Sequence, residues 1–205
     1  MTVSPFRHFV LSLALTLSAL QTPAHGQTKV TYTTDFAKQP AYWSWAGEHH
    51  DQNVDRFYKN GSLHVVNRLD NNAWIMRYDA HDARSPWSAS MSYTIDNADG
   101  NDGFGLCIQS GTVFLLYKIQ AAARTVWMGT WNSNGGQWLN VIDQQADGKF
   151  EKYSESIKPT GSKNEMSIQV SNGMMTFLVN GVEVDRRTMT GPLAPFLNEV
   201  GGMGV

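Results

Sequence analysis

Glu183 and Asp185 are separated by a single residue and carry the side chains that acid–base catalysis uses. Retaining glycosidases need two carboxyl groups about 5–5.5 Å apart, one as nucleophile and one as acid/base. Alternation along a strand would place both carboxyl groups on one face, away from the core. However, Glu183 follows directly on Asn180-Gly181, and its expected partner Leu178 is apolar. We therefore interpret the pair as a solvated polar strand face rather than a catalytic site.

The loop from Asp96 to Asp102 concentrates oxygen-bearing side chains. Calcium takes about six to eight oxygen ligands, so the loop has the composition of a calcium site, although its spacing does not match an EF-hand. The same residue types are favoured in turns that hold no metal. The sequence thus requires no cofactor and leaves Ca2+ as an alternative to a plain turn. The candidate ligands are Asp96, Asp99, Asn101 and Asp102.

Seven tryptophans are many for a chain of 205 residues. An indole offers a flat apolar face and one N–H donor, a combination suited to stacking on a sugar ring. Core packing will take several of the seven. Trp127 and Trp131 share one face of an expected strand, and Trp43 and Trp45 stand two apart in a polar setting. These four are the candidate ligand-binding residues.

Two Asn-Gly pairs, Asn172-Gly173 and Asn180-Gly181, lie between runs that suit strands. Asn-Gly is the strongest short hairpin signal, because both central residues of a type I′ turn need positive φ. Two-residue turns at both sites predict a three-stranded antiparallel meander over residues 164–188 with one buried apolar face. The predicted pairs are Val170–Met175, Ile168–Phe177, Met166–Val179, Val179–Val182 and Phe177–Val184.

Before this meander almost every apolar run is short, rich in β-branched and aromatic residues, and bounded by turn residues. No segment shows a convincing helical period. Many short strands with regular turn signals predict an all-β sandwich or barrel. The predicted strands are Leu63–Val66, Ala73–Tyr78, Ala89–Ile95, Gly103–Gln109, Val113–Ile119 and Thr125–Trp131.

The first 26 residues have the composition of a signal peptide, with a basic Arg7, an apolar run from Phe9 to Leu20, and small residues near Gly26. The apolar run is too short to cross a bilayer. We expect cleavage near Gly26-Gln27 and a secreted or periplasmic protein. Its remaining residues, 27–205, are expected to form a single β-sandwich domain.

The charge balance argues against two classes of partner. The chain has 16 Lys and Arg against 18 Asp and Glu, a net charge of −2. Without Arg7 the balance becomes 15 against 18, or −3. No run of like charge stands out, so neither nucleic acid nor an anionic membrane is expected as a partner. Cys107 is the single cysteine and is expected to be a small core residue.

Several short motifs occur in a characteristic order along the chain: residues 101–106, 136–138, 164–166, 177–181 and 200–205. This order resembles the concanavalin A-like lectin/glucanase superfamily, in particular laminin-G-like domains of exported bacterial proteins. The resemblance covers roughly residues 31–205 and implies a jelly-roll β-sandwich of two curved antiparallel sheets. A further strand usually follows the Gly-rich segment in such domains. The resemblance therefore implies truncation before the last strand, and further domains in a longer protein.

The same resemblance bears on activity. Retaining glucanases of the superfamily carry a second glutamate shortly after the aspartate, where this chain has Arg187 or Thr188. Hydrolases of 3-keto glycosides usually carry a glutamate on a central strand, and the matching residues 92–95 lack one. We expect an exported domain that binds carbohydrate or a surface glycan without a recognisable catalytic site. A glycoside hydrolase or 3-keto-glycoside hydrolase relative, and a laminin-G-type protein-binding or adhesion module, remain the alternatives.

Overall fold

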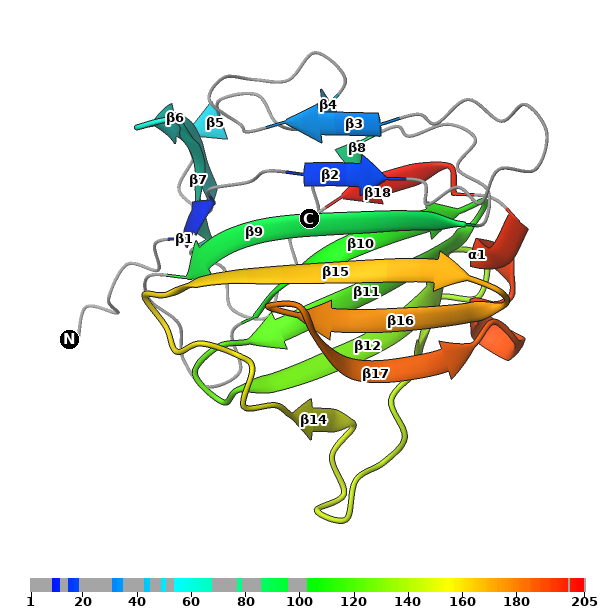
Figure 1. Cartoon of the computed structure of the whole chain (residues 1–205). Coiled ribbons are helices and arrows are strands. Elements are labelled where there is room, and N and C mark those ends of the chain that lie inside the picture. Colours follow the sequence, from blue (N-terminus) through cyan, green and yellow to red (C-terminus); the bar gives the residue numbers. More distant parts are fainter. Residues whose placement is uncertain are drawn as a thin grey trace.

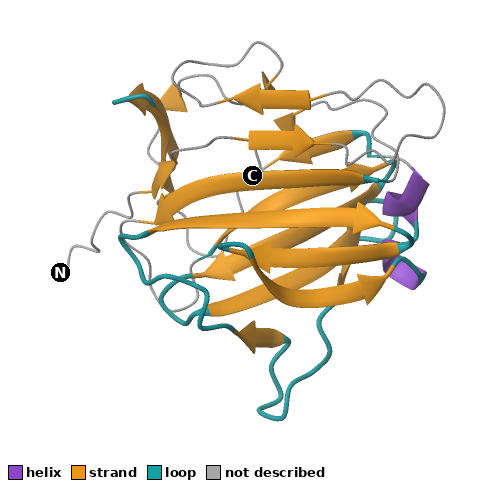
Figure 2. Cartoon of the chain, viewed as in Figure 1, coloured by secondary structure: helices purple, strands orange, loops and turns teal. Residues whose placement is uncertain are grey.

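The computed structural model describes residues 9–11, 15–18, 31–34, 43–44, 49–50, 54–67, 77–78, 86–95, 103–198 and 200–204. Strands make up most of these residues, and helix is confined to two short turns at one end of the sheets (Figure 2). These turns are η1 (Gly191–Leu193) and α1 (Pro195–Asn198). All strand pairs are antiparallel, and two large sheets lie one over the other (Figure 1).

The front sheet has eight strands in the order β17-β16-β15-β9-β1-β7-β6-β5. Its long members, β9, β15, β16 and β17, cover the other large sheet (Figure 1). In this order the strands are β17 (Val182–Thr188), β16 (Met174–Val179), β15 (Lys163–Ser171), β9 (Trp87–Ile95), β1 (Phe9–Leu11), β7 (Ser62–Asn67), β6 (Val54–Lys59) and β5 (His49–His50).

The back sheet follows the order β13-β12-β11-β10-β18-β8-β4, with β14 also paired to β12. A separate two-stranded sheet joins β2 (Leu15–Ser18) to β3 (Thr31–Thr34). The strands of the back sheet are β13 (Gln137–Asn140), β12 (Thr125–Asn132), β11 (Val113–Gln120), β10 (Phe104–Ser110), β18 (Gly202–Gly204), β8 (Arg77–Tyr78), β4 (Trp43–Ser44) and β14 (Glu151–Tyr153).

The expected strands agree with the observed ones within a residue or two at each end wherever the structure describes them. Of the predicted strand Ala73–Tyr78, only Arg77–Tyr78 lies within the described residues, as β8. Met91, Tyr93 and Ile95 are buried, so this face of β9 points into the core. Cys107 is also buried, as expected of a small packing residue.

The meander is confirmed. Asn172 and Asn180 have φ of 50° and 51°, as type I′ turns require. β15 and β16 pair in the predicted register, with Ile168 opposite Phe177. The pair Val179–Val182 across the second turn is also observed, but Val182 is 53% exposed and so does not belong to the buried face.

The prediction that Phe177 faces Val184 is wrong. The register between β16 and β17 shifts after Leu178, so Phe177 lies opposite Asp185 instead. This irregularity is a β-bulge, in which one strand carries an extra residue and the faces of the residues beyond it are exchanged. The shift reassigns Asp185 and Arg187 to the core-facing side of β17.

The core lies between the two sheets and is built from their inward faces. Tyr117 of β11 and Phe177 of β16 meet edge to face across it, with ring centroids 5.2 Å apart. The Tyr117 hydroxyl donates to the Leu178 carbonyl at 3.2 Å. Burial raises the pKa of this hydroxyl well above its ordinary value, so it remains a neutral donor. Trp87 donates its Nε1 proton to the Phe196 carbonyl at 3.1 Å and ties α1 to the front sheet.

A buried amide network holds the turn before β15 against the second hairpin. Asn164 is buried and accepts the Lys158 backbone N–H at 2.9 Å through Oδ1. Asn180 donates through Nδ2 to the same Oδ1 at 2.9 Å and to the Ser156 carbonyl at 2.7 Å. Its own Oδ1 accepts the Glu165 N–H at 2.9 Å. The second Asn-Gly turn is therefore tied to a segment some 20 residues earlier, in addition to reversing the chain.

β1 and β2 both come from residues 1–26, the expected signal peptide. β1 pairs with β9 on one side and β7 on the other. These pairings belong to the uncleaved chain, and removal of the leader remains a prediction.

Candidate functional site

The alternation of β12 sorts its side chains between the two faces of the back sheet. Val126 and Met128 point into the core and are fully buried, so Trp127 and Trp131 lie on the outer face. Trp138 of β13 stands directly opposite Trp131. These three residues, Trp127, Trp131 and Trp138, form one surface, which we call the aromatic strip.

The indoles of the strip form a continuous series. The ring centroids of Trp127 and Trp138 are 5.5 Å apart with an interplanar angle of 68°, and those of Trp131 and Trp138 are 5.6 Å apart at 46°. Both distances are typical of favourable aromatic pairs. Trp138 is 40% exposed, while Trp127 and Trp131 are half-buried. The strip is thus an aromatic surface that reaches solvent and is supported by its own ring contacts.

Contacts from three strands fix the orientation of Trp127. A Cβ atom at Gly129 would lie 2.4 Å from Cη2 of Trp127, so the ring occupies the space that glycine leaves open. The Trp127 Nε1 proton is donated to Asn140 Oδ1 at 3.0 Å. The Lys118 ammonium lies 5.9 Å from the ring centroid, within the range of cation–π attraction. The ring is therefore held in place before any ligand arrives.

Polar groups flank the Trp127 end of the strip. Glu151 of β14 pairs with Trp127 across the strands. The Thr125 hydroxyl lies 2.6 Å from Gln120 Oε1 and 3.3 Å from Glu151 Oε2. Because a hydroxyl has a single proton, Thr125 donates to the nearer Gln120 oxygen and Glu151 keeps its capacity to accept. Together with the Lys118 ammonium, this end of the strip offers both donors and acceptors.

The structure places Trp127 and Trp131 on one face, as alternation predicts, and adds Trp138. The turn residues 132–136 indicate that the chain reverses before Trp138, but only the register observed in the structure sets Trp138 opposite Trp131. Trp43 lies in β4, and its side chain is outside the described residues. Trp45 and the proposed calcium ligands Asp96, Asp99, Asn101 and Asp102 also lie outside them.

The bulge in β17 separates the two candidate catalytic carboxylates. Glu183 stands opposite Leu178 and forms an exposed ion pair with Arg186. Asp185 stands opposite the inward-facing Phe177, and its side chain is only 11% exposed. The expectation that both lie on the face away from the core is therefore wrong.

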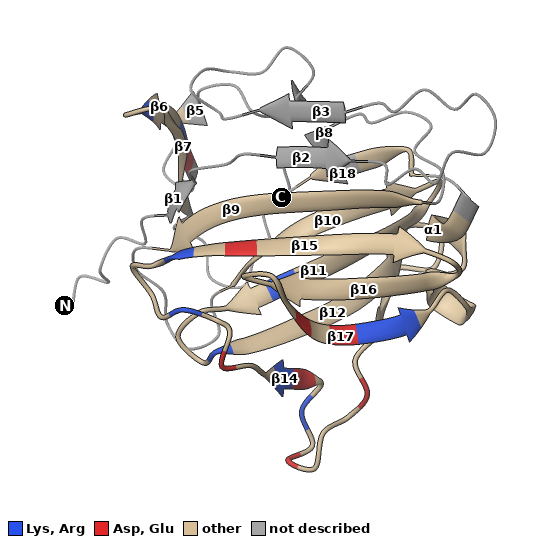
Figure 3. Ribbon diagram, in the orientation of Figure 1, with Lys and Arg blue, Asp and Glu red and all other residues tan. Residues whose placement is uncertain are grey.

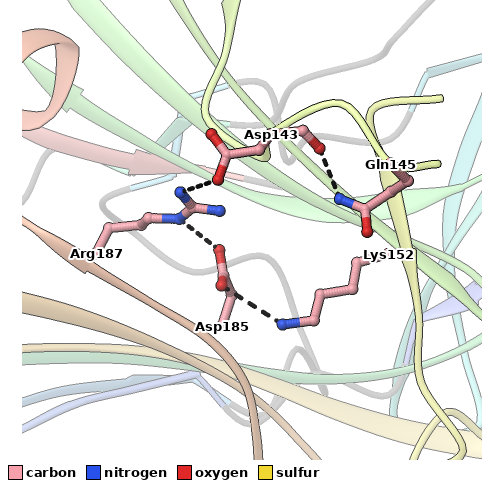
Figure 4. A network of polar contacts seen from close by, with 5 residues as sticks. All are labelled: Asp143, Gln145, Lys152, Asp185 and Arg187. Atoms are coloured by element: carbon pink, nitrogen blue, oxygen red, sulfur yellow. Dashed lines mark hydrogen bonds and ion pairs between the residues drawn. The ribbon is translucent and has the colours of Figure 1, made fainter. Parts of the chain in front are cut away.

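Asp185 belongs to an ion-pair network instead. Arg187 Nε donates to Asp185 Oδ2 at 2.7 Å, and Nη1 donates to Asp143 Oδ2 at 2.8 Å (Figure 4). Lys152 Nζ lies 3.6 Å from the other Asp185 oxygen. Charged residues of both signs gather on β17, on β14 and on the connection before β14 (Figure 3). The network joins the edge of the front sheet to the connection between β13 and β14, the two short strands that pair one after the other along one edge of β12.

We expect Arg187→Met to lower the free energy of unfolding by about 1–2 kcal/mol, since it leaves a mostly buried carboxylate with a single distant partner. The matched control is Arg186→Met on the same strand. Its ion pair is exposed, so a loss below about 0.5 kcal/mol is expected. Urea denaturation measures both. Equal losses for the two variants would contradict a linking role for Arg187.

Two further observations concern the described residues alone. No group of three or more His, Cys, Asp or Glu side chains among them is arranged to hold a metal ion. None of their helices has the length and apolar character needed to cross a membrane.

Comparison with known proteins shows similarity at the level of structure. No protein-family model matches the chain, and no curated protein sequence matches it significantly. The carbohydrate-binding module CBM66 from Bacillus subtilis superposes with a TM-score of 0.52 and 14% identity, over 80% of this chain and 87% of that one. Sheep galectin-11 in complex with glycerol matches with a TM-score of 0.40 and 15% identity, over 65% of this chain and 92% of that one. The first likeness shows a jelly-roll β-sandwich of antiparallel sheets.

Proposed function

We propose that this protein binds carbohydrate on the outer face of its back sheet, through the aromatic strip. The observation that carries the proposal is the unbroken contact of three partly exposed indoles. A pyranose ring presents an apolar C–H face and polar hydroxyls around its rim. Indole faces flanked by Lys118 and Glu151 suit both parts of such a ligand. The likeness in fold to a carbohydrate-binding module supports the same function.

The charges beside the strip are mixed, which favours a neutral ligand over nucleic acid. The Lys118 cation and the Glu151 carboxylate lie on either side of Trp127. Nucleic-acid sites instead neutralise several phosphates with clustered cations, and their affinity falls steeply with salt. Carbohydrate binding by stacking and neutral hydrogen bonds should change little between low and physiological salt.

We expect Trp138→Ala to weaken binding to a retained polysaccharide at least about tenfold, or roughly 1.4 kcal/mol. Trp138 lies between the other two rings, so its loss interrupts the strip. Affinity gel electrophoresis with soluble glucans, xylan, mannan and fructan in the gel finds the retained polysaccharide, and titration calorimetry measures the affinity.

Leu139→Ala is the matched control for this experiment. Leu139 is 50% exposed on the same strand and points to the opposite face from Trp138. Its variant should bind as the unaltered protein does. Retention that is equal in both variants would refute the aromatic strip as the site. Turnover of a chromogenic glycoside would indicate a hydrolase.

The protein is also proposed to be exported. Arg7 and the apolar run after it form a leader, and its cleavage would release β1 from its place between β9 and β7. Mass spectrometry of the protein secreted by a bacterial host should show an N-terminus near Gln27. A periplasmic or secreted product that retains Met1 would contradict cleavage.

A further inference from the structure

The aromatic strip is longer than one sugar unit. Trp127 and Trp131 are four residues apart on one strand, which places their Cα atoms about 13 Å apart at about 3.3 Å per residue. Trp138 fills the interval, with ring centroids 5.5 and 5.6 Å from its two neighbours. A single pyranose, comparable in size to one indole, covers only part of this surface.

Among the described residues, the polar groups beside the strip all come from the sheet that carries it. Lys118 comes from β11, Asn140 from β13 and Glu151 from β14, each hydrogen-bonded in register with β12 or its neighbours. A ligand bound on the indoles therefore contacts these groups on the side that faces the sheet and along its two edges. Recognition of a chain terminus instead requires a concave site that closes around the last unit.

The end of the strip at Trp131 is bordered by glycine. Gly135 and Gly136 are the last two residues of the exposed turn 133–136 after β12, and the position of a Cβ at Gly136 is 3.9 Å from Cη2 of Trp131. The φ of 63° at Gly136 favours glycine at this position. A larger residue at position 136 would place its side chain beside the Trp131 ring, whereas glycine places no side chain there. A ligand chain can therefore continue past Trp131.

We propose that the strip binds internal runs of an extended polysaccharide chain, with successive units packed against the three indoles along β12. This inference rests on the proposed carbohydrate binding and specifies its ligand as a polymer rather than a chain terminus. The polar groups at the Trp127 end and the apolar Phe114 opposite Trp131 make the two ends of the strip unlike. The bound chain therefore has a preferred direction.

The test uses the polysaccharide that affinity gel electrophoresis identifies, cut by partial acid hydrolysis and fractionated from the monosaccharide to six units. Calorimetry should show affinity rising at least about tenfold from the disaccharide to a plateau at longer chains. Reduction of the reducing end with borohydride, and chemical blocking of the other end, should change the affinity of the longest fragment less than twofold.

Trp131→Ala separates a strip from a closed terminal site. On a strip, the variant should lose at least about fivefold in affinity for the longest fragment but less than twofold for the shortest one that binds. A uniform loss at all lengths, a monosaccharide that binds as tightly as the polymer, or loss of binding on blocking one end would overturn the inference while leaving carbohydrate binding intact. Retention of no polysaccharide by the unaltered protein would instead refute the proposed function itself.

Discussion

Phe177→Ala is expected to lower the free energy of unfolding by about 3–5 kcal/mol, the usual loss for a buried phenylalanine. Phe177 is fully buried and packs edge to face on Tyr117 of the opposite sheet. Its removal leaves a cavity between the two sheets that the surrounding side chains fill only partly. Urea denaturation followed by tryptophan fluorescence measures the change.

The control for this variant is a substitution at the next residue along the strand, Leu178. Leu178 points outward and is partly exposed, so Leu178→Ala should cost about 1 kcal/mol or less. If Phe177→Ala does not yield a folded protein, Phe177→Leu keeps part of the volume and should show a smaller loss of the same sign. Equal losses at 177 and 178 would contradict the inward placement of Phe177.

Asn180→Ala is expected to lower the free energy of unfolding by about 3 kcal/mol, from two causes. An alanine at φ of 51° costs about 1 kcal/mol, because the left-handed region is strained for residues with a Cβ. The lost side chain also made hydrogen bonds to Glu165 N, Ser156 O and Asn164 Oδ1. The buried Asn164 is left with fewer partners, which adds about 1–3 kcal/mol.

The first Asn-Gly turn separates these two causes. Asn172 has nearly the same φ, 50°, and lies in an exposed turn. Asn172→Ala should therefore show the conformational cost of about 1 kcal/mol, so the difference between the two alanine variants isolates the amide network. Asn180→Gly keeps positive φ accessible and should recover only the conformational part. Identical losses at 172 and 180 in urea denaturation would rule out a stabilising role for the network.

In residues 164–188, turn chemistry and strand alternation predict the first hairpin correctly but not the pairing beyond it. The Asn-Gly turns require positive φ, and the alternation of Met166, Ile168 and Val170 requires one buried face, so the first hairpin is predictable residue by residue. Beyond Leu178 the same rules fail, because the bulge places Asp185 on the inner side. The partner that stabilises Asp185 there, Arg187, also bonds to Asp143, which is 44 residues away.

The aromatic strip is likewise predictable from the sequence in part only. Alternation along β12 predicts that Trp127 and Trp131 share a face, and the structure agrees. The contribution of Trp138 depends on the register across a turn of Asn, Ser and Gly residues that has several possible lengths. Lys118 and Glu151 lie beside the strip on strands at the two sides of β12. Only the order of the strands in the folded sheet places them there.

The amino-acid sequence alone determined the β class of the fold, the positions of its main strands and the two tight turns. These features depend on turn chemistry and alternation, which act between neighbours along the chain. The tertiary structure decided which strands lie side by side, which carboxylate turned inward and which indoles came together. Those outcomes depend on contacts between residues far apart in sequence, where burial and pairing outweigh local preference.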